Sequence, residues 1–156
     1  MDSQLVEAPP VLVLARLGAV MRRAFARRMA DEAWATEAGM RPGCFSVLRA
    51  VGGAGAAGEA PSQRALSDQL GIDPSDLVGL IDALEEAGYV DRRRDPADRR
   101  RYAIDLTAAG EEALGRFDVV AATVADDVFG VLPADERAVL EGLLIRVVTQ
   151  HEAGAG

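Results

Sequence analysis

The sequence contains no lysine, one cysteine and one histidine among its 156 residues. The lone cysteine, Cys44, excludes a disulfide within the chain and fits a reducing compartment. Together with His151, it leaves too few ligands for most zinc sites and too few groups for Cys/His catalysis. We therefore expect no metal ion and no cofactor.

Aromatic residues and long hydrophobic runs are also scarce. The first apolar run, Val11 to Leu14, is soon broken by Arg16, well short of the about 20 residues that cross a bilayer. Aromatic residues make up 4% of the chain, although 49% is hydrophobic and 27% charged. This composition is typical of one globular domain with a core of leucine, valine and alanine. We expect a cytoplasmic protein with no membrane partner.

All 17 basic residues are arginine, and six of them lie in one stretch, RRRDPADRRR, from Arg92 to Arg101. Six arginines and two aspartates give this stretch a net charge of +4 in a chain of net charge −8. A sequence pI near 4.7 predicts repulsion from nucleic acid at long range. Because the guanidinium fork matches phosphates and base edges, the uneven charge nevertheless indicates a polyanion at this turn. The alternative is a solvated charged turn, the usual fate of a charge run.

The spacing of apolar residues predicts a mainly helical chain with one β-hairpin. A glycine- and alanine-rich stretch at 52–61 predicts a loop, and Ser62, Asp73 and Thr107 are predicted helix N-caps. The predicted order is α-α-α-α-β-β-α-α, with helices over 10–34, 42–51, 62–70 and 74–87, strands over 89–93 and 100–106, and helices from 107 and from 133.

Two short helices around a glycine-containing turn, followed by a hairpin, form a winged helix-turn-helix. The flanking long helices carry wide apolar stripes that a monomer of this length has little material to cover, which indicates a homodimer. The chain then divides into an N-terminal dimerisation region at 10–41, a DNA-binding winged helix-turn-helix at 42–106, and C-terminal dimerisation helices at 107–153.

The charge of the second helix in the motif argues against DNA. Seven acidic residues and no basic one lie between Ala65 and Asp91. A carboxylate accepts a hydrogen bond from cytosine N4, but it also faces phosphates, so contacts elsewhere must hold such a helix in the groove. A protein-interaction module with weak or no DNA binding stays open as an alternative. An enzyme that uses paired carboxylates is disfavoured, because no pair stands out by spacing, and we expect no enzyme.

The stretch from Ser62 to Gly110 resembles the winged-helix core of MarR-family transcriptional regulators. The most specific parts are DALEEAGYV, an R-x-x-x-x-DRR pattern after it, and LTAAG. The resemblance implies a homodimeric bacterial regulator, more often a repressor than an activator, that binds double-stranded DNA. It also implies release of the DNA when a small aromatic ligand binds near the junction of the two regions. Two-fold symmetry predicts a pseudo-palindromic site.

The resemblance assigns DNA contacts to three places. In the wing, Arg100 enters the minor groove beside Asp98, and the other wing arginines are Arg92, Arg93, Arg94, Arg99 and Arg101. The exposed face of the recognition helix carries Ser75, Asp76, Val78, Gly79 and Asp82, and the start of the preceding helix carries Ser62, Gln63 and Arg64. Gly79 departs from the family, because many members have a basic or polar residue there.

Six side chains are candidates to line an effector pocket, although residues at such helical spacing are more often plain core: Met21, Phe25, Trp34, Met40, Phe45 and Phe117. Cys44 does not match the first-helix cysteine of the oxidant-sensing members. We therefore expect Cys44 to be a small buried apolar side chain rather than a redox sensor.

Overall fold

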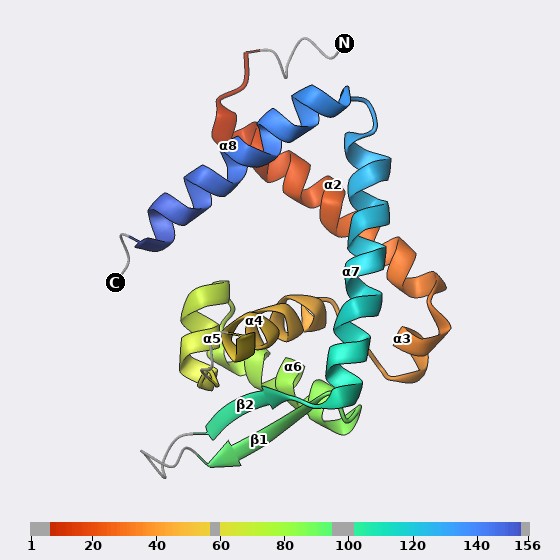
Figure 1. Ribbon diagram of the computed structural model, residues 1–156, viewed down its shortest axis with the longest axis vertical. Coiled ribbons are helices and arrows are strands. Elements are labelled where there is room, and N and C mark those ends of the chain that lie inside the picture. The colour runs from red at the N-terminus through yellow and green to blue at the C-terminus, as the bar shows by residue number, and fades with distance from the viewer. Residues whose placement is uncertain (1–6, 57–59, 95–101, 154–156) are drawn as a thin grey trace.

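The computed structural model describes residues 7–56, 60–94 and 102–153 of the chain. Within these residues, seven helices and one antiparallel hairpin follow one another along the chain (Figure 1). They are α2 (Pro10–Asp31), α3 (Ala33–Glu37), α4 (Cys44–Ala56), α5 (Gln63–Leu70), α6 (Pro74–Glu86), β1 (Val90–Arg94), β2 (Tyr102–Leu106), α7 (Ala108–Phe129) and α8 (Ala134–Ala153). The predicted fold, a winged helix-turn-helix flanked by long helices, is confirmed.

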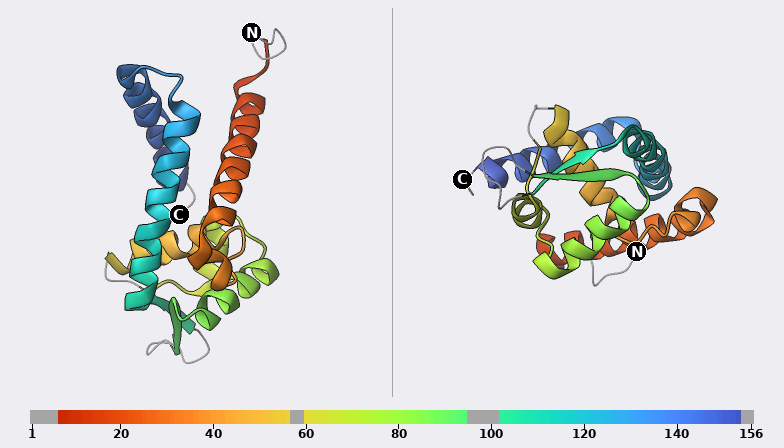
Figure 2. Two further views of the ribbon diagram at one scale, coloured as in Figure 1. Left: turned by 90° about the vertical axis from the view of Figure 1, so that its right-hand side faces the viewer. Right: turned by 90° about the horizontal axis from the view of Figure 1, so that it is seen from below.

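The molecule has a lower body and two arms, one formed by α2 and the other by α7 and α8 (Figures 1 and 2). Helices α4, α5 and α6 form the body with the hairpin, and α2 and α7 pack against each other and extend away from it (Figures 1 and 2). Helix α8 turns back from the far end of α7, and Figure 2 shows it standing apart from α2. Among the described helices, none is both long and apolar enough to pass through a bilayer.

The core lies in the body, where α4, α5, α6, the hairpin and α7 meet. Its fully buried side chains include Leu48, Leu66, Leu77, Ile81, Leu84, Ile104 and Phe117. By contrast, α2 and the described side chains of α8 include no buried residue. Burial therefore stabilises the winged helix-turn-helix, while the arms are left with apolar surface.

The predicted caps hold the ends of the helices. Ser62 Oγ accepts a hydrogen bond from the Ala65 N–H at 3.2 Å, and Thr107 Oγ1 accepts one from the Gly110 N–H at 3.0 Å. Gly71 ends α5 at φ 61°, a left-handed conformation that glycine adopts without strain. These local signals place α5, α6 and α7 close to their predicted limits.

The helix predicted over 10–34 is wrong at its end, and five helices rather than four precede the hairpin. Helix α2 ends at Asp31, and Glu32 adopts an extended conformation with φ −88° and ψ 105° before α3 begins. The Glu32 carboxylate accepts the Trp34 indole N–H at 2.8 Å. The break redirects the chain so that Trp34 packs edge-on against Phe117, with 4.9 Å between the ring centroids.

The loop predicted at 52–61 is also wrong in part, because α4 continues through three glycines to Ala56. A Cβ at Gly52 would lie 2.9 Å from a Leu114 methyl carbon and 3.2 Å from a Leu106 methyl carbon. Close packing of α4 on α7 and β2 therefore overrides the poor helix propensity of glycine.

A further contact was not predicted: the Ile104 N–H donates to the Pro61 carbonyl at 3.0 Å, and Ser62 forms a β-bridge with Ala103.

Candidate nucleic-acid interface

Helix α6 presents an outward face that no element of the body covers. Its apolar residues Leu77, Leu80, Ile81 and Leu84 are buried. Residues three and four apart share a helix face, so the opposite face carries Ser75, Gly79, Asp82 and Glu86. Of the predicted contact residues on α6, Ser75, Asp76, Val78 and Asp82 are exposed, and Gly79 is half-buried.

The N-terminus of α6 is fixed by Asp73 and Pro74. Asp73 Oδ1 accepts hydrogen bonds from the Ser75 N–H at 2.8 Å and from the Ser75 hydroxyl at 2.5 Å. These bonds favour the ionised carboxylate and lower the pKa of Asp73. The exposed end of the helix is thereby held in one orientation.

The three residues predicted at the start of the preceding helix differ in their exposure. Arg64 is almost fully exposed, and its one ion pair with a described residue is with Asp68, at 3.8 Å. Gln63 is half-buried at the first position of α5, and Ser62 is occupied as the helix cap and in the bridge to β2. Arg64 therefore has the greatest freedom of the three to meet a phosphate.

The described arginines of the wing have different partners. Arg92 pairs with both Asp82 and Glu85 of α6, and its side chain is 18% exposed. Arg93 pairs with Asp105 of β2 at 2.7 Å. Arg94 is exposed, and its guanidinium carbon lies 5.9 Å from the centre of the Tyr102 ring. Arg92 therefore clamps the hairpin to α6, while Arg94 keeps its donors at the surface.

The tip of the predicted wing lies outside the described residues. It comprises Asp98, Arg99, Arg100 and Arg101, so their roles remain predictions.

One cation at this surface was not predicted from the sequence: Arg41, in the segment between α3 and α4. A Cβ at Gly79 would lie 3.0 Å from one terminal nitrogen of Arg41 and 3.5 Å from the other. The guanidinium therefore rests on the outward face of α6. The departure at Gly79 was the one signal in the sequence, but the sequence gives no means of pairing it with a residue on another element.

The six residues predicted to line an effector pocket lie around the junction of α2, α3, α4 and α7. Four of them form an aromatic cluster centred on Phe117, whose ring lies 5.5 Å from Phe45 and 6.4 Å from Phe25 between centroids. Trp34 is the fourth member, and the Arg116 guanidinium carbon lies over its ring, 5.7 Å from the centroid. Met40 packs against the core, and Met21 is half-buried on α2.

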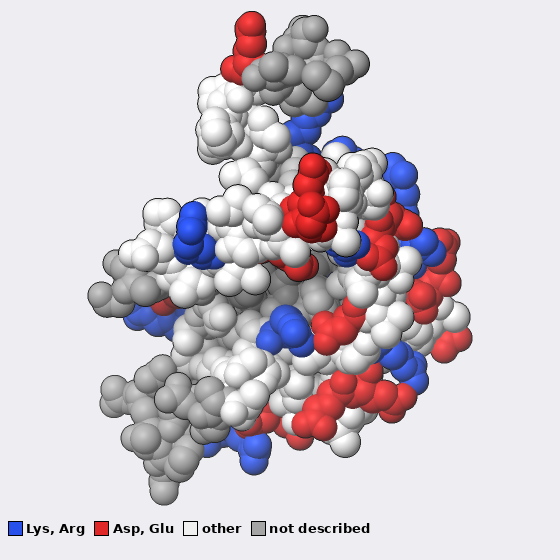
Figure 3. All heavy atoms as spheres, turned by 45° about the horizontal axis from the view of Figure 1, so that its top comes forward, with Lys and Arg blue, Asp and Glu red and all other residues white. Residues whose placement is uncertain are grey.

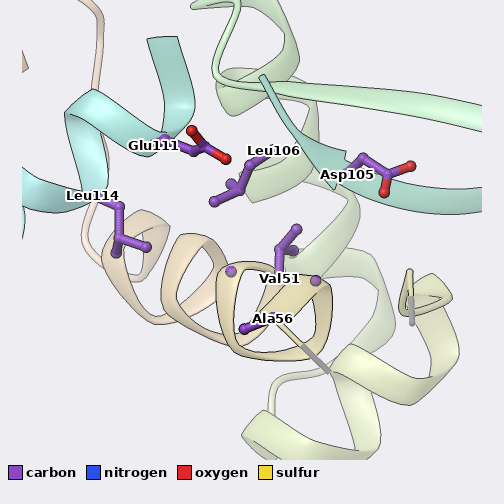
Figure 4. A pocket seen from close by; sticks show the side chains of 8 residues that line it. Val51, Ala56, Asp105, Leu106, Glu111 and Leu114 are labelled. Carbon is purple, nitrogen blue, oxygen red and sulfur yellow. The ribbon is translucent and has the colours of Figure 1, made fainter. Parts of the chain in front are cut away.

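A surface hollow of about 430 Å³ lies elsewhere, between the end of α4, β2 and the start of α7. Figure 4 shows Val51, Leu106 and Leu114 around it, with the Glu111 carboxylate above them. The Asp105 carboxylate is turned aside in the same view, and it bonds Arg93. This hollow shares no lining residue with the predicted effector pocket.

Cys44 is fully buried, which confirms its expected place in the core. Burial raises the pKa of the thiol, partly offset by the nearby Arg41 charge and backbone hydrogen bonds. A buried neutral thiol is a poor nucleophile, and no metal-binding group of three or more His, Cys, Asp or Glu occurs among the described residues.

Comparisons with known proteins agree on one family. The model of the MarR family matches residues 38–101. A proposed transcriptional regulatory protein for the hcr operon of Thauera aromatica is 33% identical over 152 residues, which cover 96% of this chain and 89% of that protein. A MarR-family transcriptional regulator from Rhodococcus sp. RHA1 has a TM-score of 0.72 at 27% identity, over 86% of this chain and 89% of that one. CouR from Rhodococcus jostii RHA1, solved with p-coumaroyl-CoA bound, has a TM-score of 0.66 at 27% identity, over 86% and 88% of the two chains.

Proposed function

We propose, from the premise that this chain belongs to the MarR family of DNA-binding transcriptional regulators, that it is a ligand-responsive homodimeric repressor. Each subunit places α6 in a major groove and the wing in the adjacent minor groove of a pseudo-palindromic operator. The region at 42–106 binds DNA, and the regions at 10–41 and 107–153 form the dimer. The family consists of regulators rather than enzymes.

The observation that carries this proposal is the outward face of α6 beside the wing strands. Ser75, Asp76 and Asp82 are exposed on a helix whose N-terminus is fixed by its cap. Arg92 bonds two acidic residues of this helix and so reduces its repulsion from phosphate. Arg94 and the arginines at the wing tip then supply the charge that holds the helix in the groove.

Uncovered apolar surface on both arms supports the homodimer. Figure 3 shows mostly uncharged atoms over the arm formed by α8, while charged side chains gather on the opposite side of the same view. The exposed apolar residues of the two arms include Val11, Leu12, Leu14, Val139, Leu143, Ile145, Val147 and Val148. Two-fold packing of these arms sets the two α6 helices about one DNA turn, roughly 10 base pairs, apart.

The effector proposed for this protein is a small aromatic molecule at the junction of body and arms. The bound p-coumaroyl-CoA of CouR supports this class of ligand. The lining residues are the six predicted ones, Met21, Phe25, Trp34, Met40, Phe45 and Phe117. A ligand there releases DNA only if it binds better to a conformation whose α6 spacing does not fit the operator. Trp34 is the only tryptophan, so its fluorescence reports ligand binding directly.

The test is fluorescence anisotropy with duplexes from upstream of the protein's own gene, and with duplexes selected from a random pool. We expect salt-steep binding of one dimer per operator, because phosphate contacts release counterions. Arg100→Ala should lose about 1–3 kcal/mol of binding free energy. Arg116→Ala is the matched control. It removes the same charge, but Arg116 is on α7 and pairs with Glu112, so this variant should bind DNA as tightly as the wild type does.

Each other outcome of this titration has a definite meaning. Unchanged affinity in Arg100→Ala removes the wing from the mechanism. Absence of DNA binding at low salt favours the alternative, a winged helix that binds a protein partner through its acidic α6. An aromatic acid or its coenzyme A thioester that quenches Trp34 without weakening DNA binding contradicts the effector proposal.

A further inference from the structure

Arg41 and Gly79 lie on different elements but meet on the outward face of α6. The terminal nitrogens of Arg41 lie 3.0 Å and 3.5 Å from the place that a Cβ of residue 79 would take. A contact of 3.0 Å is tighter than nine in ten real Cβ contacts, so a side chain at 79 would require the guanidinium to move by a few tenths of an ångström. Gly79 is in the middle of α6, where glycine costs about 1 kcal/mol of helix stability relative to alanine. The close approach of Arg41 gives a packing reason for a glycine at this position.

The guanidinium of Arg41 has unused hydrogen-bond donors. Arg41 is exposed, and within the part of the chain that the structure describes no carboxylate pairs with it. Arg92 of β1, which also lies against α6, is in the opposite situation, since Asp82 and Glu85 occupy its donors. Arg41 thus lies against α6, the recognition helix, without being part of it, and keeps hydrogen-bond donors available for a ligand.

Helix α6 itself supplies no such group. It contains acidic residues at 76, 82, 85 and 86 and no arginine. Its outward face offers the Ser75 hydroxyl, already bonded to Asp73, and carboxylates that accept hydrogen bonds but cannot donate them. Guanine O6 and N7, both acceptors, are read in the major groove most often by a bidentate arginine. Among the described residues, the guanidinium that lies on this face with no carboxylate on its donors comes from the α3–α4 segment.

We propose that Arg41 reads a guanine in each half-site of the operator, and that Gly79 is the gap that admits it to the recognition surface. This inference rests on the proposed function, because it requires α6 to enter the major groove. The residue that specifies a base is then supplied from outside the recognition helix.

The inference is tested on the full-length protein with an operator that the wild type selects from a random duplex pool. Arg41→Ala should weaken operator binding on the order of tenfold or more while affecting unrelated duplexes much less. Arg41→Lys keeps the charge but not the planar fork, so it should keep the salt dependence without restoring operator affinity. Arg49→Ala is the matched control, because Arg49 is an exposed arginine of α4 that pairs with Asp118.

Gly79→Ala separates this role from a merely structural one. Its Cβ requires the guanidinium to shift by a few tenths of an ångström, so it should weaken operator binding, yet it should raise the thermal midpoint because alanine favours the helix. In an Arg41→Ala background, Gly79→Ala should weaken binding no further. Replacing one guanine of the half-site by 7-deazaguanine, which lacks N7, should lower the operator affinity of the wild type and leave that of Arg41→Ala unchanged.

Three results overturn the inference. The first is an Arg41→Ala variant that binds the operator as tightly as the wild type does. The second is an equal loss of affinity for operator and unrelated DNA, which identifies a phosphate contact. Full additivity of Gly79→Ala and Arg41→Ala shows that the alanine clashes with DNA by itself. In all three the wild type still binds its operator and the proposed function stands, whereas a wild type that binds no duplex overturns both.

Discussion

Single ion pairs decide how acidic the recognition surface is. Arg92 bonds Asp82 and Glu85 through a side chain that is 18% exposed, so two of the carboxylates on α6 already have a cation. Charge-assisted bonds of this kind are stronger than neutral ones. Arg94, two residues further along the same strand, lies beside the Tyr102 ring and has no carboxylate partner among the described residues. Adjacent arginines of one run therefore serve different purposes, one within the fold and one at its surface.

Asp73 gives a pH-dependent prediction at this scale. Its bonds from Ser75 hold the pKa of the carboxyl below the ordinary aspartate value of about 3.9. A lowered folded-state pKa stabilises the fold above that ordinary value, and the stabilisation is lost as pH falls through the lowered one. We expect Asp73→Ala to lower the thermal midpoint at pH 7, and the difference from wild type to narrow as pH falls below about 4. Circular dichroism melts across this range measure both effects.

Asp68→Ala is the control for that experiment. Asp68 lies 3.8 Å from Arg64 in an exposed pair within α5 and caps no helix. Its removal should change the melting midpoint little at any pH. A difference between Asp73→Ala and wild type that stays constant down to the acid limit of folding contradicts the capping role.

At the scale of elements, what could be predicted from the sequence is what local contacts determine. Ser62, Asp73 and Thr107 cap helices whose first turns follow them directly, so their starts were predictable. The course of α4 through Gly52 was not, because its partners Leu106 and Leu114 lie far along the chain. The candidate site divides in the same way. The outward face of α6 follows from helix periodicity, whereas the pairs of Arg92 and the place of Arg41 depend on contacts between elements.

Gly110 provides a prediction about how α7 joins the hairpin. A Cβ at this position would lie 1.9 Å from the Tyr89 carbonyl oxygen, which already accepts the Thr107 N–H at 3.1 Å. Neither backbone segment can rotate away as a side chain does. We expect Gly110→Ala to reduce the free energy of unfolding by about 3 kcal/mol, the upper end of the range for overpacking. Urea unfolding followed by circular dichroism measures this loss.

Gly115→Ala is the matched control in the same helix. Nothing lies within 4 Å of a Cβ there, so alanine should stabilise α7 by up to about 1 kcal/mol. If both variants change stability equally, glycine at 110 reflects helix propensity alone, and the close approach of α7 to Tyr89 has no energetic weight.

At the scale of the whole molecule, charge and apolar surface are separated. The chain has a net charge of −8, yet the wing concentrates arginine, so its long-range field opposes DNA while its local surface attracts it. The apolar residues of α2 and α8 lie on the arms, away from the wing (Figures 1 and 3). A second copy that covers the arms leaves both recognition helices open, and it doubles the number of phosphate contacts per particle.

The double substitution Leu143→Glu and Val147→Glu tests this arrangement. The two residues are one helical turn apart on α8 and are 45% and 56% exposed in the single chain. Because neither is buried within the subunit, carboxylates there cost the monomer little, and any large effect arises from association.

Multi-angle light scattering should give twice the 16.4 kDa chain mass for wild type and the chain mass for the variant. Operator affinity should fall with it, since one subunit engages only one half-site. Val119→Glu on α7, 68% exposed but not part of the apolar surface of α2 and α8, should stay dimeric and bind DNA. A double variant that remains a dimer would exclude α8 from the interface and leave its apolar surface to another partner.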